Sequence, residues 1–183
     1  MENQIDFQLL SFGMRRIGWI RFWTQTVLGV VVTGILSLGL INGSERDLGL
    51  NGGLVVTSFS FIVLLYSLWH SWLIVLTGRA LASGARPSRG ETGRLIKRGV
   101  FADLLGLVFA VVGYEALMGP LFFQAARQTS GIAMVGTGVS NDDSPINALE
   151  MLSVFSNTQV LLAHVIGLIF SLWLLQRIYR NRK

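Results

Sequence analysis

Four long apolar runs alternate with short polar segments along the chain. They lie at about residues 19–41, 54–76, 99–121 and 151–176, and each has the roughly 20 residues that a helix needs to cross a hydrocarbon core of about 30 Å. The pattern predicts an all-α fold, an integral membrane bundle of four transmembrane helices over residues 19–176. Residues 1–18 are then an N-terminal cytoplasmic or interfacial segment, and residues 177–183 are a basic cytoplasmic tail.

Two segments between these runs have distinct compositions. Residues 81–93 are rich in Gly, Ser and Arg, which predicts an irregular connection. Residues 127–147 mix apolar with polar positions and end near Ser144–Pro145. We expect a loop or a short interfacial helix there, before the last helix begins.

The distribution of basic residues predicts the orientation of the bundle. Three of the 15 Lys and Arg precede or open the first run, six lie between the second and third runs, and four end the chain. The other two segments hold only Arg46 and Arg127. Cytoplasmic segments of membrane proteins carry the excess of Lys and Arg, so both termini and the middle segment are expected on the cytoplasmic side. The three residues counted in the N-terminal group are Arg15, Arg16 and Arg21.

Composition excludes several classes of protein. Hydrophobic residues make up 51% of the chain and charged residues only 14%, against about 25% charged in a soluble domain. There is no Cys, which excludes disulfides and thiol chemistry. The net charge of +5 comes from residues between apolar runs, so membrane topology explains it and no nucleic-acid partner is expected. No phosphate-binding loop, zinc-protease motif or nucleophile elbow is present, and we expect no enzymatic activity.

Small residues recur at every fourth position in three of the runs. Such spacing forms a groove on a helix that lets another backbone approach closely. The grooves either pack the four helices against one another or form a contact with a second copy or another subunit. The residues are Gly29, Thr33, Ser37, Gly106, Ala110, Ala163, Gly167 and Ser171.

Four ionisable residues lie inside the predicted spans, where a charge costs about 2.5–3.5 kcal/mol. They are His70, Asp103, Glu115 and His164. Depth counted at about 1.5 Å per residue sorts them into two layers, Glu115 with His164 and Asp103 with His70. Each layer would share a proton, bind a metal or only satisfy two buried polar groups.

Simpler explanations remain open for the second layer. Arg98 and Lys97 stand about one turn from Asp103, and His70 suits an interface beside tryptophans. The different depths of the two histidines argue against a shared haem. The sequence therefore names no cofactor and leaves a bound metal unknown.

Several short motifs resemble one family. Phe22–Trp23–Thr24–Gln25 opens the first span, and Ala163–His164 is followed by Gly167–Leu168 in the last. Together they resemble the cyanobacterial and plastid four-span membrane proteins of an uncharacterised domain type (DUF3611), over residues 15–178. The sequence departs from the plant pattern at Asp103 and Glu115, where that pattern has neutral amides. This departure argues against a carboxylate-based metal site common to the family.

The resemblance implies a function and a location. The plant member belongs to the chloroplast inner envelope and is described both as a protein-import translocon component and as an iron permease. No long transit extension precedes the first span, so a bacterial, cyanobacterial plasma or thylakoid membrane is expected. Two hypotheses follow: a permease for a small ion or metal such as iron, or a non-transporting accessory or assembly subunit of a translocon or photosynthetic complex. Both imply contact with the lipid bilayer and either a homo-oligomer or a place in a larger membrane complex.

Overall fold

The computed structural model describes residues 2–41, 51–83, 89–130, 146 and 148–180. These residues form four α-helices, α1 (Glu2–Ile41), α2 (Asn51–Ala82), α3 (Arg89–Ser130) and α4 (Ala148–Arg180). Within them, no residue forms a strand. Each helix contains a segment long and apolar enough to cross a membrane, at Ser11–Leu38, Gly52–Ala82, Gly90–Ala126 and Glu150–Ile178. The predicted all-α fold with four membrane-spanning helices is confirmed.

The helices are longer than the runs that predicted them. At 1.5 Å per residue, the 42 residues of α3 extend about 63 Å, roughly twice the thickness of a hydrocarbon core. Residues 2–18, expected as a separate segment, are continuous with the first span in α1. Part of the expected irregular connection is helical, because α3 already begins at Arg89 and carries Arg89, Arg94, Lys97 and Arg98.

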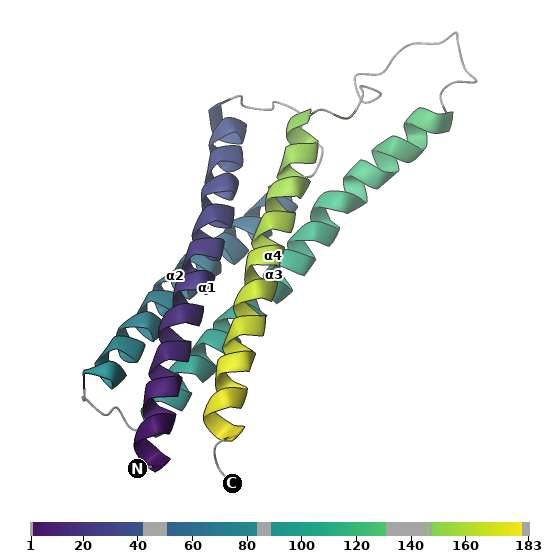
Figure 1. The fold of residues 1–183 in the computed structure, drawn as a ribbon. Helices are drawn as coiled ribbons and strands as arrows, with labels where there is room; N and C mark the ends of the chain where they lie inside the picture. Colours follow the sequence, from purple (N-terminus) through teal and green to yellow (C-terminus); the bar gives the residue numbers. More distant parts are fainter. Residues whose placement is uncertain (1, 42–50, 84–88, 131–145, 147, 181–183) are drawn as a thin grey trace.

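The outer end of α3 passes through a proline. Pro120 lies inside the helix, which continues to Ser130, and Figure 1 shows this end of α3 leaning away from the other helices. Proline removes one backbone hydrogen bond and crowds the preceding turn, yet the helix does not end there. Most of the loop or interfacial helix expected over 127–147 lies outside the described residues.

The four helices form an antiparallel bundle in the cyclic order α1, α2, α3, α4. Each packs against its two neighbours, and α2 also approaches α4 across the bundle, whereas no close backbone contact joins α1 and α3 in the described residues. The start of α1 and the end of α4 lie at the same end of the bundle (Figure 1). Which side of the membrane that end faces remains a prediction from the basic residues.

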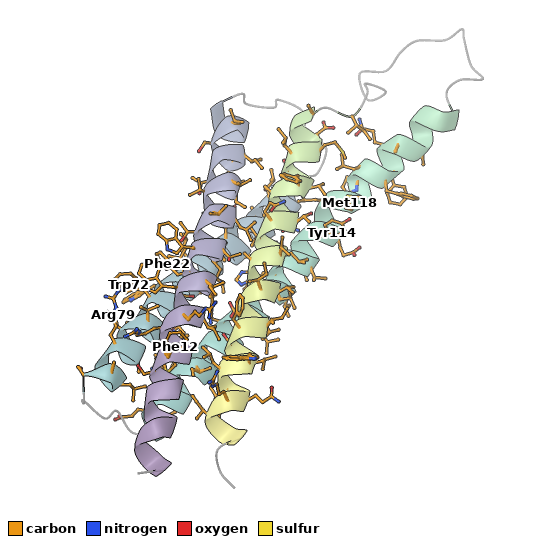
Figure 2. All side chains as sticks on the ribbon, viewed as in Figure 1. Phe12, Phe22, Trp72, Arg79, Tyr114 and Met118 are labelled. Carbon is orange, nitrogen blue, oxygen red and sulfur yellow. The ribbon has the colours of Figure 1, made fainter. Side chains whose placement is uncertain are left out.

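The buried face of every helix repeats at alternating intervals of three and four residues. In α2 it includes Gly53, Thr57, Ser60, Leu64, Ser67, Ser71, Ile74 and Gly78. This heptad spacing is that of helices packed at a shallow angle. Large apolar side chains instead cover the outside, where Phe22 and Trp72 lie together with ring centroids 5.7 Å apart (Figure 2). The interior combines small and polar side chains with a buried apolar cluster of Met14, Ile74, Ile96 and Leu174. Small and polar residues between helices, with apolar side chains facing outward, are expected of a bundle surrounded by lipid.

Candidate functional site

An ion pair lies at the centre of the bundle. Nη2 of Arg21, from α1, lies 2.9 Å from Oδ2 of Asp103, from α3, and both side chains are fully buried. Because α1 and α3 stand on opposite sides of the bundle, the long arginine side chain reaches across its axis. A buried charge is stable in such surroundings only if it is paired and hydrogen-bonded.

Serines from the other two helices add hydrogen bonds to this pair, whereas the buried Nε of Arg21 has no hydrogen-bond partner among the described residues. Nη2 of Arg21 donates to Ser67 Oγ of α2 at 2.7 Å, and Nη1 donates to Ser171 Oγ of α4. The Ser67 hydroxyl in turn donates to Asp103 Oδ1 at 2.6 Å. All four helices therefore meet at one charged group. Hydrogen bonds to charged groups are about twice as strong as neutral ones, so this contact fixes how the helices are arranged.

Gln25 extends the network by one turn of α1. Its Nε2 donates to Ser67 Oγ at 3.1 Å and to the Ala163 carbonyl at 3.4 Å, and its Oε1 accepts from Ser71 at 3.0 Å. The amide is fully buried and links α1 to both α2 and α4. It uses donor and acceptor together, as a buried amide must.

His164, on α4, adds a second ionisable group beside Asp103. Its Nε2 lies 3.2 Å from the Ser60 carbonyl, and its Nδ1 lies 3.6 Å from Asp103 Oδ1. A carbonyl only accepts hydrogen bonds, so Nε2 carries a hydrogen. A neutral ring then turns the lone pair of Nδ1 toward a carboxylate, whereas a proton on Nδ1 would face a negative oxygen. At 3.6 Å the two atoms are not hydrogen-bonded, and Nδ1 of His164 is a buried polar atom without a hydrogen-bond partner in the part of the chain that the structure describes. A proton placed on Nδ1 would have Asp103 Oδ1 beside it, between two fully buried side chains.

Glycines make the space for these side chains. A Cβ atom at Gly106 would overlap the His164 ring. A Cβ atom at Gly167 would lie 2.6 Å from Gln25 Nε2 and 2.7 Å from Asp103 Oδ1. Glycine is therefore required at both positions for close approach, not for backbone conformation.

A smaller polar layer lies further along the bundle, toward the Pro120 end of α3. Asn157 of α4 donates through Nδ2 to the Ala110 carbonyl of α3 at 2.8 Å, and its Oδ1 accepts from the Thr57 hydroxyl of α2 at 3.1 Å. A Cβ atom at Gly113 would lie 2.9 Å from Thr57 Oγ1. Scattered polar residues of the sequence thus form an interior that is polar at several levels.

The structure regroups the four predicted ionisable residues. It does not bring Glu115 and His164 together, because Glu115 is exposed on the outside of α3 while His164 is buried. Asp103 pairs with Arg21 and His164, in place of His70 or the nearby Arg98 and Lys97 considered from the sequence. Twelve residues at 100° each place Glu115 about 120° around α3 from Asp103. Counting depth alone does not detect that difference.

His70 has a different partner. Its Nε2 donates to the Leu95 carbonyl of α3 at 2.6 Å, and its ring stacks on Tyr66 with centroids 6.0 Å apart. A Cβ atom at Gly99 would lie 2.8 Å from its Cδ2. His70 is therefore held by a hydrogen bond and by packing between α2 and α3, beside Tyr66 and not beside the tryptophans considered from the sequence.

The predicted small-residue grooves divide into two groups. Gly29 of α1 is buried inside the bundle. The five residues of α3 and α4 are buried there too, namely Gly106, Ala110, Ala163, Gly167 and Ser171. Thr33 and Ser37 are exposed, and their hydroxyls bond to carbonyls of their own helix, those of Gly29 and Thr33. Most of the small residues therefore pack the helices of one chain against each other.

Arg21 is the site residue that sequence reasoning missed. It was counted with the cytoplasmic cations because it stands near the start of the first apolar run. Its spacing was informative, since Met14, Gly18, Arg21, Gln25 and Val32 recur at intervals of three, four and seven and are all buried. An arginine in that register with a buried glutamine belongs to the packed face of the helix.

Metal coordination has little support in the described part of the chain. No group of three or more His, Cys, Asp or Glu side chains gathers there in a way that would hold a metal ion. His164 and Asp103 are neighbours, but Arg21 places a positive charge on the same carboxylate. That cation disfavours a bound divalent metal at this point.

The bundle, its apolar outer surface and its hydrogen-bonded polar interior define an integral membrane protein with four transmembrane helices. Residues 5–179 match the family described as "Protein of unknown function (DUF3611)", and the chain belongs to this family. The resemblance inferred from the Phe-Trp-Thr-Gln and His-x-x-Gly-Leu motifs is therefore confirmed.

A plant relative supports the same grouping. The chain is 28% identical over 167 residues to "Protein TIC 21, chloroplastic" of Arabidopsis thaliana. The aligned region covers 90% of this chain and 56% of the Arabidopsis protein, so the chain spans a little over half the length of that relative. No solved structure matches the chain.

Proposed function

We propose that this protein is a permease that moves a small ion across its membrane, and that His164 and Asp103 bind a proton during the transport cycle. One observation carries the proposal: Nδ1 of His164 lies 3.6 Å from Asp103 Oδ1 with both side chains fully buried. Ionisable groups at membrane depth are costly and commonly mark ion or proton pathways. A stabilising role alone needs no titratable ring beside the carboxylate, since Arg21 already neutralises it.

Proton binding at this place changes the charge of the whole interior. With a neutral His164, Arg21 and Asp103 form a pair of zero net charge. A proton on His164 adds one positive charge and gives Asp103 two cationic partners that compete for it. Such competition weakens the hold of Arg21 on Asp103, and with it the contact that joins all four helices. Proton binding would thereby shift the balance between two arrangements of the helices.

The transported ion is proposed from the family relationship. The resemblance implies iron as one candidate, and the name of the Arabidopsis relative connects that protein with the chloroplast. A cyanobacterial plasma or thylakoid membrane remains our proposal for the location. A bacterial membrane would supply the proton gradient that a proton-binding permease requires.

Transport into liposomes tests this function. Purified protein is reconstituted with an Fe²⁺-sensitive chelator dye inside, and uptake of Fe²⁺ is measured with and without a pH gradient. We expect uptake above that of protein-free liposomes and a dependence on the gradient. His164→Gln should reduce uptake by about tenfold or more, because an amide still donates a hydrogen bond but does not take up a proton.

Glu115→Gln is the matched control. It also removes one ionisable group from a span, but from an exposed position on α3. This variant should transport as well as the parent protein. Wild-type uptake equal to that of empty liposomes for Fe²⁺, Mn²⁺ and protons would exclude the permease function.

An accessory subunit is the second candidate, favoured by the spread of the Arg21 hydrogen bonds over three helices. Both terminal nitrogens of its guanidinium have partners, and these partners come from three different helices. A permanently fixed interior suits a rigid subunit that serves as a scaffold in a membrane complex. Purification in a mild detergent would then recover stoichiometric partner proteins, and the His164→Gln variant would recover them equally well.

A further inference from the structure

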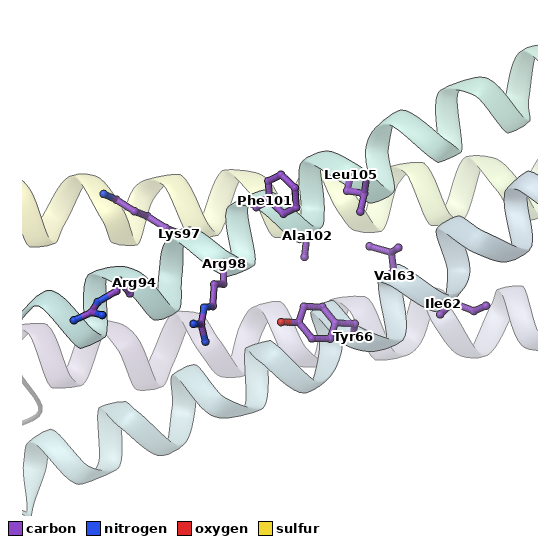
Figure 3. A pocket seen from close by; sticks show the side chains of 9 residues that line it. All are labelled: Ile62, Val63, Tyr66, Arg94, Lys97, Arg98, Phe101, Ala102 and Leu105. Carbon is purple, nitrogen blue, oxygen red and sulfur yellow. The ribbon is translucent and has the colours of Figure 1, made fainter.

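A groove of about 710 Å³ opens on the outer surface between α2 and α3, separate from the polar interior. Figure 3 shows its two different ends. Arg94, Lys97 and Arg98 stand at one end, and the apolar side chains of Ile62 and Leu105 stand at the other. Tyr66 and Phe101 lie between them.

The basic end of the groove is a single face of α3. Arg94, Lys97 and Arg98 follow one another at the i, i+3 and i+4 positions, which place them side by side on a helix. All three side chains are exposed. Glu91 precedes them by one turn, so residues 91–98 carry a net charge of +2. This end therefore attracts an anion.

The apolar part of the groove lies within the membrane-spanning segments of both helices. Ile62 is 59% exposed, Tyr66 49% and Phe101 69%. From Arg94 to Leu105 the groove follows 11 residues of α3, which corresponds to about 16 Å along the helix. The cavity is thus elongated, charged at one end and apolar along the remainder.

We propose that this groove binds one anionic phospholipid, with the phosphate on Arg94, Lys97 and Arg98 and an acyl chain along Ile62, Tyr66 and Phe101. Basic residues at the cytoplasmic end of a span attract anionic headgroups, and the groove places an apolar channel directly beside them. A second copy of the chain is a poorer occupant. A symmetric contact through this groove would bring two rows of like charge together.

Native mass spectrometry in a mild detergent tests the site. The protein is incubated with equal amounts of phosphatidylglycerol and phosphatidylcholine of the same acyl chains, and the retained lipids are counted. We expect one phosphatidylglycerol per chain, preferred at least fivefold over phosphatidylcholine. The variant Arg94→Gln/Lys97→Gln/Arg98→Gln should lose this preference.

Two further variants separate the site from general attraction. Arg15→Gln/Arg16→Gln/Arg79→Gln removes the same charge from exposed positions on α1 and α2, and should retain the preference. Val63 of α2 also lines the groove. Val63→Trp fills the groove without changing charge, and should reduce the bound lipid about fivefold. Because it keeps all the cations, it remains informative if the triple glutamine variant fails to fold. Equal retention of the two lipids by the parent protein, equal losses in both triple variants, or full binding by Val63→Trp would each overturn the proposal.

Discussion

Removing one partner of the Arg21–Asp103 pair should destabilise the bundle far more than removing both. At 2.9 Å and an effective dielectric constant of about 20, the two charges attract each other by about 6 kcal/mol, most of which offsets their desolvation. Asp103→Leu leaves a fully buried guanidinium without its counter-charge, and Arg21→Met leaves a buried carboxylate. We expect each single change to cost about 3–5 kcal/mol.

The double variant Arg21→Met/Asp103→Leu should recover most of that loss. It replaces two buried charges with apolar side chains of related size, which is often nearly neutral for stability. The coupling free energy of the cycle should then be at least about 3 kcal/mol. Unfolding in detergent, followed by the fluorescence of the five Trp residues, measures all four proteins.

A control cycle uses two exposed residues. Arg79→Met and Glu115→Leu also remove one cation and one carboxylate, but from the outer surface of α2 and α3. Their effects should add to within about 0.5 kcal/mol, as expected of residues that share no partner. Equally additive effects at Arg21 and Asp103 would refute the buried ion pair.

Three further predictions concern packing, pairing and orientation. Gly167→Ala should destabilise the protein by about 1–3 kcal/mol in the same unfolding assay, because its Cβ atom meets Gln25 and Asp103. The control Gly34→Ala meets nothing within 4 Å and should be neutral or stabilise by up to about 1 kcal/mol. A larger loss of stability in Gly34→Ala than in Gly167→Ala would show that the α4 face is not packed. His164→Ala should couple with Asp103→Asn by more than about 1 kcal/mol and be additive with Glu115→Gln; coupling to Glu115 instead would contradict the observed grouping. Because the chain has no Cys, Asn141→Cys and Lys183→Cys each introduce one labelling site. A membrane-impermeant maleimide added to intact cells should label the Asn141→Cys variant alone. Labelling of both variants, or of Lys183→Cys only, would contradict the predicted orientation.

The transmembrane fold was predictable because the length and apolarity of a run along the sequence are enough to identify a membrane-spanning helix. A helix across lipid needs about 20 apolar residues whatever its neighbours are, and four such runs are present. The ends of the helices were less predictable, since hydropathy falls at Arg15 and Arg16 while the helix continues from Glu2 to Ile41. Hydropathy marks where lipid is in contact with the chain. It does not mark where a helix begins.

The sequence predicted that Asp103 and His164 belong to the candidate site, but it did not predict that they lie next to each other. Asp103 and His164 were identified because charge at membrane depth is costly, and both belong to the observed cluster. Their pairing depends on which way each helix faces, and counting residues from the middle of a span carries no information on rotation. Heptad spacing does carry it, and in α3 the series Gly99, Asp103, Gly106, Ala110 and Gly113 marks the buried face and excludes Glu115.

The role of Arg21 in the site was missed because the sequence places it among the cytoplasmic Lys and Arg residues. The excess of Lys and Arg predicts topology well when the cations are summed, and Arg21 contributed to that sum. Its side chain nevertheless enters the bundle, because Asp103, Ser67 and Ser171 provide partners that come from three other helices. The heptad spacing around residue 21 indicates that the side chain is buried, but it does not indicate these partners, because they depend on the tertiary fold.

Ion transport by the uncharged double variant tests the central claim most directly. Arg21→Met/Asp103→Leu is expected to fold, so any loss of function reports on the charges and not on stability. Reconstituted beside the parent protein at equal amounts, it should show no pH-dependent Fe²⁺ uptake above empty liposomes. Uptake equal to that of the parent protein would contradict the account, because the buried charges would then only hold the helices together.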